Sequence, residues 1–207
     1  MRTVLLPVKD FRYAKQRLAP VLEAARRAGL ARAMLFDVME AISKAGRPER
    51  VVVFTASDEA MEISRSFGFD IVPEVSVQGH SAAVNQMLER LSPAASRILS
   101  IAGDLPTITS KDIDDVLDSE AHEVGLVASR DGTGTNGLLL VTPARIRMEY
   151  GQDSLKRHLT NAASAGFQAQ VLHIPGIEFD IDTPEDLQWF REGSHVGTHT
   201  WKYIARP

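Results

Sequence analysis

The sequence predicts a single α/β domain in which a mostly parallel sheet lies between two layers of helices, a three-layer α/β/α arrangement. Short apolar runs bounded by turn-forming residues recur along the chain, as at 3–8, 51–55 and 97–102, and each has the length of a buried strand. Stretches of helical periodicity separate these runs. Strands that alternate with helices favour parallel order with helices on both faces of the sheet. A length of 207 residues with 44% hydrophobic residues fits one domain with a sizeable core.

The elements follow in order from start, stop and periodicity signals. Ser57 precedes one predicted helix as an N-cap and Gly68 follows it, while Thr183-Pro184 opens the last. Two pairs of consecutive strands, near 124–142 and 169–181, depart from strict alternation. The predicted strands are 3–8, 51–55, 69–73, 97–102, 124–129, 137–142, 169–174 and 179–181, and the predicted helices are 18–44, 57–67, 81–91, 109 onward, 154–165 and 183 onward.

The domain is predicted to cover 1–193, and 194–207 is a C-terminal tail. This tail lacks periodicity, so we expect it either to be loose or to pack against a partner subunit.

Composition excludes several classes of function. A net charge of -4 gives no basic balance of the kind that suggests nucleic-acid binding. The chain has no cysteine, which rules out disulfides, thiolate metal sites and a cysteine nucleophile. The apolar run that precedes Pro7 is too short for a signal peptide or a membrane span, so we expect a cytoplasmic protein with no membrane partner.

Carboxylates follow two predicted strands. Asp104 comes after 97–102 in a Gly-Asp-Leu-Pro turn, and Asp180 and Asp182 lie at a second strand end. Ligands of open α/β sheets bind at such ends, and oxygen donors without His or Cys favour Mg²⁺, with Mn²⁺ as the alternative. Alternation along a strand would turn Asp180 and Asp182 to opposite faces, so one of them is expected to act through water unless the strand ends there. The competing interpretation makes them turn and helix-cap residues.

The loop after the first strand is rich in cations, with Lys9, Arg12, Lys15 and Arg17. Arginine and lysine at this position suit a nucleoside triphosphate, although a solvated basic loop has the same composition. Neither GxGxxG nor GxxxxGK[ST] is present, which excludes a dinucleotide fingerprint and a P-loop.

Two further segments are candidate anion-binding sites. The loop 130–137 is rich in glycine and hydroxyl groups and leads into a strand, and 150–154 lies at a predicted helix N-terminus. Backbone N–H groups and hydroxyls in such places bind phosphate or carboxylate, although each alone is also an ordinary turn or cap. The histidines lack metal spacing, and no GxSxG motif supports a Ser-His-Asp triad.

Six sequence blocks resemble, in fixed order over about residues 3–190, the guanylyltransferases of deazaflavin (coenzyme F420) biosynthesis. The blocks are VKDFRYAKQRLAP, AVNQML, GDLP, RDGTGTNGLLL, YGQDSLKRHL and FDIDTPEDL. That family includes archaeal 2-phospho-L-lactate guanylyltransferase and bacterial phosphoenolpyruvate guanylyltransferase. The resemblance implies a fold similar to the GT-A-type nucleotidyltransferases.

The resemblance also implies roles for individual residues. Asp104, Lys15 and Arg17 would be catalytic, and Asp104, Asp180 and Asp182 would hold Mg²⁺. Thr135, Gly151 and Ser154 would bind the phosphorylated three-carbon acid. The GTP side would comprise Lys9, Lys15, Arg17, Asn85 and Gly103, although the segment 78–84 before Asn85 is less rich in Gly, Asp and Pro than in bacterial members.

The expected reaction is transfer of GMP from GTP to phosphoenolpyruvate, which gives enolpyruvyl-2-diphospho-5'-guanosine and pyrophosphate. The product would pass to a downstream transferase of the same pathway, and the chain is compatible with a homodimer. 2-phospho-L-lactate and 3-phosphoglycerate are alternative acceptors, because they also carry a phosphate and a carboxylate on three carbons. Outside this reaction, a related transferase acting on a sugar phosphate or molybdopterin and a catalytically silent nucleotide-binding regulatory domain remain open.

Overall fold

The computed structural model describes residues 1–74, 80–142 and 144–205, and within them the strands form one sheet in the order β3-β2-β1-β4-β6-β5-β7. The strands are β1 (Arg2–Val8), β2 (Arg50–Thr55), β3 (Asp70–Pro73), β4 (Arg97–Ile101), β5 (Val124–Ala128), β6 (Thr135–Val141) and β7 (Ala169–Leu172). The helices are α1 (Ala24–Lys44), α2 (Asp58–Ser66), α3 (His80–Leu91), α4 (Ser110–Asp118), α5 (Ser154–Ser164), α6 (Pro175–Glu178), α7 (Pro184–Glu192) and α8 (His199–Ile204). Short 3-10 turns lie at Phe11–Tyr13 and Gln16–Leu18.

The sheet is mostly parallel, as predicted. β1 pairs in parallel with β2 and β4, β2 with β3, and β5 with β7, whereas β6 is antiparallel to both β4 and β5. The predicted departure from alternation near 124–142 is therefore the β5–β6 hairpin. Because β6 runs in reverse, its first residues lie beside the end of β4, where Ile101 pairs with Gly137.

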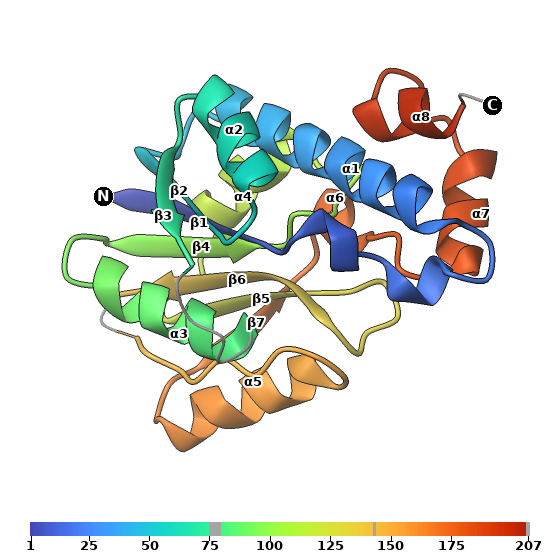
Figure 1. Cartoon of the computed structure of the whole chain (residues 1–207). Coiled ribbons are helices and arrows are strands. Elements are labelled where there is room, and N and C mark those ends of the chain that lie inside the picture. Colours follow the sequence, from blue (N-terminus) through green and yellow to red (C-terminus); the bar gives the residue numbers. More distant parts are fainter. Residues whose placement is uncertain (75–79, 143, 206–207) are drawn as a thin grey trace.

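Helices cover both faces of the sheet, which confirms the three-layer prediction. Helices α1, α2 and α4 lie on one face, and α3 and α5 lie on the other (Figure 1). Successive strand residues point to opposite faces, so Leu6 packs in the core under α1 while Leu5 packs in the core against α3. Within the described residues, no helix is both long enough and apolar enough to cross a lipid bilayer.

The first helix starts later than predicted. Its periodicity extends back to Leu18, but α1 begins at Ala24, and a 3-10 turn followed by an irregular segment occupies the intervening chain. Pro20 lies in this segment and has no backbone N–H, so a helical hydrogen-bond ladder cannot run through it unbroken.

The predicted strand 179–181 is wrong. The chain after β7 forms the short helix α6 and then an extended segment without strand pairing. Just before this segment, the amide of Asn136 in β6 donates to the carbonyl oxygens of Ile177 and Glu178, the last two residues of α6, at 3.0 and 3.2 Å. Asn136 therefore fixes the end of α6 beside the start of β6, and the chain continues from this point without pairing to a strand.

The described part of the predicted C-terminal tail, residues 194–205, folds back on its own chain. It contains α8, which packs beside α1 (Figure 1). The carboxylate of Asp37, buried in α1, accepts hydrogen bonds from the backbone N–H groups of His199 and Thr200, at 2.6 and 2.9 Å, and from the Thr200 hydroxyl at 2.6 Å. A carboxylate that caps a helix N-terminus also interacts favourably with the helix dipole.

Asp37→Asn is therefore expected to lower the free energy of unfolding by about 2 kcal/mol, because an amide cannot accept hydrogen bonds from all three donors. Urea unfolding followed by circular dichroism measures the change. Asp115→Asn, at an exposed position in α4 where the carboxylate pairs with Lys111, is the matched control, with an expected change below about 0.5 kcal/mol. Equal changes for the two variants would contradict this role of Asp37.

Candidate active site

A cleft of about 730 Å³ opens at the carboxyl ends of β1 and β4. The cleft is lined by the loop after β1, the turn after β4, the start of β6 and the segment before α7. The first and the last of these segments come from opposite ends of the chain. Parallel strands bring their carboxyl ends to one edge, and this explains why these segments meet there. The predicted site residues that line the cleft are Lys9, Lys15, Arg17, Gly103, Asp104, Thr135, Gly151, Ser154, Asp180 and Asp182.

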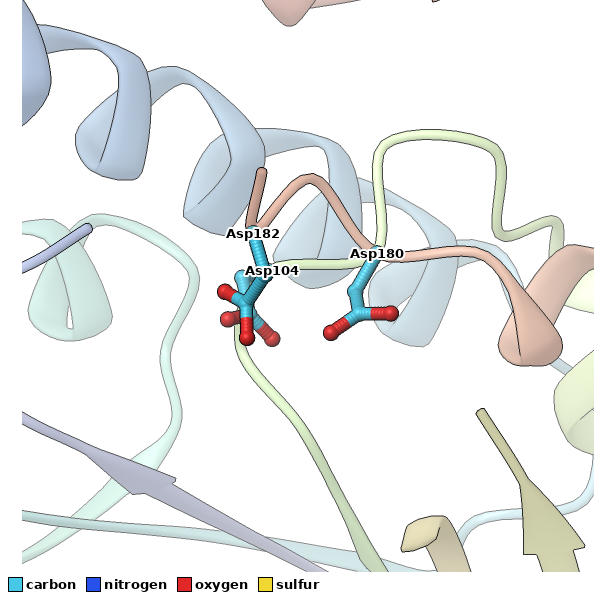
Figure 2. Close-up of side chains that lie close together, drawn as sticks. All are labelled: Asp104, Asp180 and Asp182. Carbon is cyan, nitrogen blue, oxygen red and sulfur yellow. The ribbon is translucent and has the colours of Figure 1, made fainter. Parts of the chain in front are cut away.

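The three predicted aspartates gather at one point of the cleft. Asp104 follows β4, and Asp180 and Asp182 lie between α6 and α7 (Figure 2). One carboxylate oxygen of each lies within 4.8 Å of the others. Residues 180–182 do not form a strand, so the side chains of Asp180 and Asp182 do not point to opposite faces as strand alternation would require. Such an all-oxygen cluster has the donor chemistry for Mg²⁺ or Mn²⁺.

Lys15 bridges two of these carboxylates. Its ammonium Nζ lies 2.6 Å from Asp104 Oδ2 and 2.6 Å from Asp182 Oδ1, and its side chain is only 4% exposed. Burial alone would lower the pKa of Lys15, but the two negative charges outweigh burial and raise it, so the ammonium stays charged. Lys15 has a φ of 52°, a left-handed conformation that costs a non-glycine residue about 1–2 kcal/mol. The fold therefore maintains local strain at a residue that contacts the acidic cluster.

The cations of the cleft interact more strongly with Asp182 than with Asp180. Burial raises the pKa of Asp180 to about 7, and the charge of Asp104 adds to this effect more than Lys15 offsets it. Burial also opposes ionisation of Asp182, but the charge and hydrogen bond of Lys15, helped by Arg17 and Lys9, lower its pKa overall. Of the three carboxylates, Asp180 is thus the one that forms no ion pair within the described residues, and a metal ion at the cluster would supply positive charge to it.

Asn136 holds Asp180 in place, a role that sequence reasoning missed. Its side-chain nitrogen lies 3.4 Å from Asp180 Oδ1 while it also donates to the backbone carbonyls of the last two residues of α6. Asn136 lies in the block RDGTGTNGLLL, which the resemblance includes, but the block does not show that its Asn side chain contacts Asp180.

Asp186 holds Asp182 in place and was also missed. Its Oδ2 accepts from the backbone N–H groups of Asp182 and Thr183, at 3.2 and 2.9 Å, in the capping box that begins α7. Its Oδ1 pairs with the guanidinium of Arg130 at 2.9 Å, which links the 130–137 loop to the acidic segment. An acidic residue three positions after the N-cap Thr183 is the sequence signal that could have identified it.

The two candidate anion-binding segments, 130–137 and 150–154, lie next to each other. The Ser154 hydroxyl, at the start of α5, lies 3.3 Å from Thr135 Oγ1 at the start of β6, and both side chains are buried. Gly151 has a φ of 113°, where a side chain would be strained, and it shapes the turn that leads into α5. Hydroxyls and a helix N-terminus in one place suit an anionic group.

Asn85 is the predicted site residue that the structure does not bring to the cleft. Its side-chain amide donates to the Met148 carbonyl at 3.0 Å and accepts from the Met148 N–H at 2.8 Å. It lines a different cavity, of about 440 Å³, between α3 and β6. This geometry supports a structural role for Asn85 rather than a nucleotide contact. The preceding block 78–84 lies partly outside the described residues.

The fold is of the GT-A-like type that is found in nucleotidyltransferases. A crystal structure from Desulfovibrio desulfuricans G20, whose assignment as a nucleotide-diphospho-sugar transferase is provisional, has the same fold, with a TM-score of 0.79 at 14% identity over 98% of this chain and 93% of that one.

Within this class the chain belongs to the family described as "Guanylyl transferase CofC like", which matches residues 1–206. A phosphoenolpyruvate guanylyltransferase of Conexibacter woesei is 37% identical over 91% of this chain and 86% of its own length. A 2-phospho-L-lactate guanylyltransferase of Methanothermobacter thermautotrophicus is 30% identical over 98% of this chain and 89% of its own length.

Proposed function

We propose that this protein transfers GMP from GTP to phosphoenolpyruvate and releases pyrophosphate. The observation that carries the proposal is the shared cleft, in which the Lys15-bridged carboxylates and the Thr135–Ser154 hydroxyl pair both form the lining. One side suits a triphosphate and the other suits a small acidic acceptor. The names of the relatives support this reaction, and the archaeal one makes 2-phospho-L-lactate the first alternative acceptor.

In the proposed reaction a phosphate oxygen of the acid attacks the α-phosphorus of GTP. A phosphorus–oxygen bond forms to the acid as the bond to pyrophosphate breaks. The nucleophile is already an anion, so the reaction needs no strong general base. The main obstacle is repulsion between the two anions, which the ammonium and guanidinium groups of Lys9, Lys15 and Arg17 reduce. Orientation of both substrates in one cleft lowers the barrier further.

Asp104, Asp180 and Asp182 would hold Mg²⁺, with Mn²⁺ as the alternative. The donor set fits, because the cluster offers three carboxylate oxygens and Asp180 forms no ion pair with any described residue. The bound ion would supply positive charge to the phosphates of GTP. The charges of Arg17 and Lys9, which line the same cleft, also act to lower the pKa of Asp182, so the cations proposed to bind phosphate lie near the proposed metal ligands.

Pyrophosphate release tests the function directly. The purified protein is mixed with GTP and Mg²⁺, and phosphoenolpyruvate, 2-phospho-L-lactate and 3-phosphoglycerate are compared in parallel, with ATP in place of GTP as the nucleotide control. We expect release with GTP and phosphoenolpyruvate. Release only with another of these acids would replace the acceptor, and GTP binding without release with any of them would identify a silent regulatory domain. The proposal also places the reaction in coenzyme F420 biosynthesis in the cytoplasm, with a downstream transferase that uses the product.

Ser154→Ala is expected to raise the KM for phosphoenolpyruvate about fivefold while the KM for GTP changes less than twofold, because one neutral hydrogen bond is worth about 1 kcal/mol. Initial rates of pyrophosphate release give both constants. Ser164→Ala, at the exposed end of the same helix, is the matched control and should change neither. A larger effect on the KM for GTP would move Ser154 to the nucleotide side.

A further inference from the structure

We infer that His158 is a positioning residue that fixes the hydroxyl pair of Thr135 and Ser154 as a hydrogen-bond donor toward the acceptor acid. This inference rests on the proposed function. It explains how the acceptor site formed by Thr135 and Ser154 favours an anionic group. His158 lies in α5 behind the cleft, with no exposed surface, and it does not line the cleft itself.

The hydrogen bonds of His158 determine which ring nitrogen carries the proton. Nε2 lies 3.0 Å from the backbone nitrogen of Glu149, whose N–H donates, so Nε2 is the acceptor. Nδ1 lies 3.0 Å from Thr135 Oγ1. A neutral imidazole has one N–H, which must therefore be on Nδ1 and donate to the Thr135 hydroxyl.

The surroundings of His158 keep the ring neutral. Burial lowers the pKa of His158 to about 4; the charge of Glu149 acts in the opposite direction and that of Arg157 in the same direction. The ring of Tyr150 packs edge-on at 5.3 Å between centroids. Protonation of Nε2 would set two donors against each other at the Glu149 N–H, so the geometry and the low pKa agree.

The proton on Nδ1 dictates what the hydroxyl pair can offer the cleft. Thr135 Oγ1 accepts from His158 and from Ser154, which uses both of its lone pairs. Its own O–H proton is then left for the cleft, and among the described residues no hydrogen bond from this hydroxyl to protein is found. If the bond between the two hydroxyls runs the other way, the spare proton belongs to Ser154, and the pair still presents one donor. A group that accepts, such as a phosphate or carboxylate oxygen, satisfies it.

His158 also connects the two halves of the acceptor site. The N–H of Glu149 precedes the turn at Gly151, and Thr135 begins β6, so one imidazole joins both segments. Loss of the Nδ1–H donor and loss of the Nε2 acceptor are thus separable defects. The first affects the direction of the hydroxyl donor, and the second affects the position of the turn.

Two substitutions separate these defects. His158→Asn retains an N–H near the Nδ1 position, whereas His158→Gln retains an acceptor near Nε2 and removes the donor to Thr135. We expect His158→Gln to raise the KM for phosphoenolpyruvate about five- to tenfold with the KM for GTP within twofold, and His158→Asn to stay within about threefold on both. An unchanged KM for phosphoenolpyruvate in His158→Gln, an equal rise for both acceptor and GTP, or equal effects of the two variants would overturn the inference.

A measurement without substrates keeps the inference testable if a variant does not fold. Long-range ¹H–¹⁵N spectra of the unmodified protein between pH 5 and 8 report which nitrogen of each histidine carries the proton. One histidine is expected to stay neutral with its proton on Nδ1 over the whole range, and its signal should be absent in a folded His158 variant. A proton on Nε2, or titration near pH 6.5, would overturn the inference whether or not pyrophosphate is released. A fixed Nδ1–H together with no release would instead count against the proposed function.

Discussion

Replacing Asp104 by asparagine is expected to lower kcat for pyrophosphate release about 10³-fold while the protein keeps its fold. The substitution keeps the size of the side chain and removes its negative charge. That charge contacts the Lys15 ammonium at 2.6 Å and contributes one oxygen to the acidic cluster. Loss of one charged group that positions transition-state charge typically costs about 10²–10³ in rate, and loss of a metal ligand adds to this cost.

Two measurements check the role of Asp104. Pyrophosphate release with GTP and phosphoenolpyruvate gives the rate, and Mn²⁺ titration followed by electron paramagnetic resonance gives metal affinity, which should fall about tenfold or more. Asp115→Asn, at an exposed position in α4 where the carboxylate pairs with Lys111, is the matched control. Turnover within threefold of the unmodified protein would remove Asp104 from the proposed site.

The position of the cleft could be predicted because it follows from chain topology. Asp104 comes directly after a buried apolar strand, and in a parallel sheet that strand end shares an edge with the cation-rich loop after β1. The approach of Thr135 to the same edge follows from the antiparallel β5–β6 hairpin. These relations depend on hydrophobic periodicity and strand direction, which a single sequence records.

The side chains that hold the site could not be predicted because their partners are distant in sequence. Alternating Phe-Asp-Ile-Asp looks like a strand, yet the backbone beside it bonds the amide of Asn136, more than forty residues earlier. The C-terminal helix has weak periodicity, and Asp37 fixes its first turn from 162 residues away. Local patterns predict elements, whereas such side chain–backbone bonds exist only once the tertiary fold has formed.

The left-handed backbone of Lys15 was likewise invisible in the sequence. Glycine, asparagine and aspartate favour that conformation, and lysine does not. Its adoption at residue 15 is explained by what the side chain reaches, since the ammonium contacts both Asp104 and Asp182. The strain therefore gives a physical reason to test Lys15 separately from the other cations of the loop.

Lys15→Met is expected to lower kcat about 10²–10³-fold and, at the same time, to tighten Mn²⁺ binding about tenfold. Methionine keeps the length and the apolar stem but removes the charge, which leaves Asp104 and Asp182 without their ammonium partner. A cluster with one positive charge fewer attracts a divalent cation more strongly, although the reaction loses a group that offsets charge on the phosphates. Turnover and metal affinity are measured as for Asp104→Asn.

The opposite signs of the two effects distinguish an electrostatic role of Lys15 from a structural one. If Lys15 served only to hold the carboxylates in place, its loss would disorder the cluster, and metal affinity would fall together with turnover. Lys111→Met in α4, where the ammonium is exposed, is the control and should change neither quantity. Weaker Mn²⁺ binding in Lys15→Met would show that the Lys15 ammonium organises the three aspartates. Tighter binding with slow turnover would show that the carboxylates hold the metal without Lys15 and that the ammonium acts on the substrate phosphates.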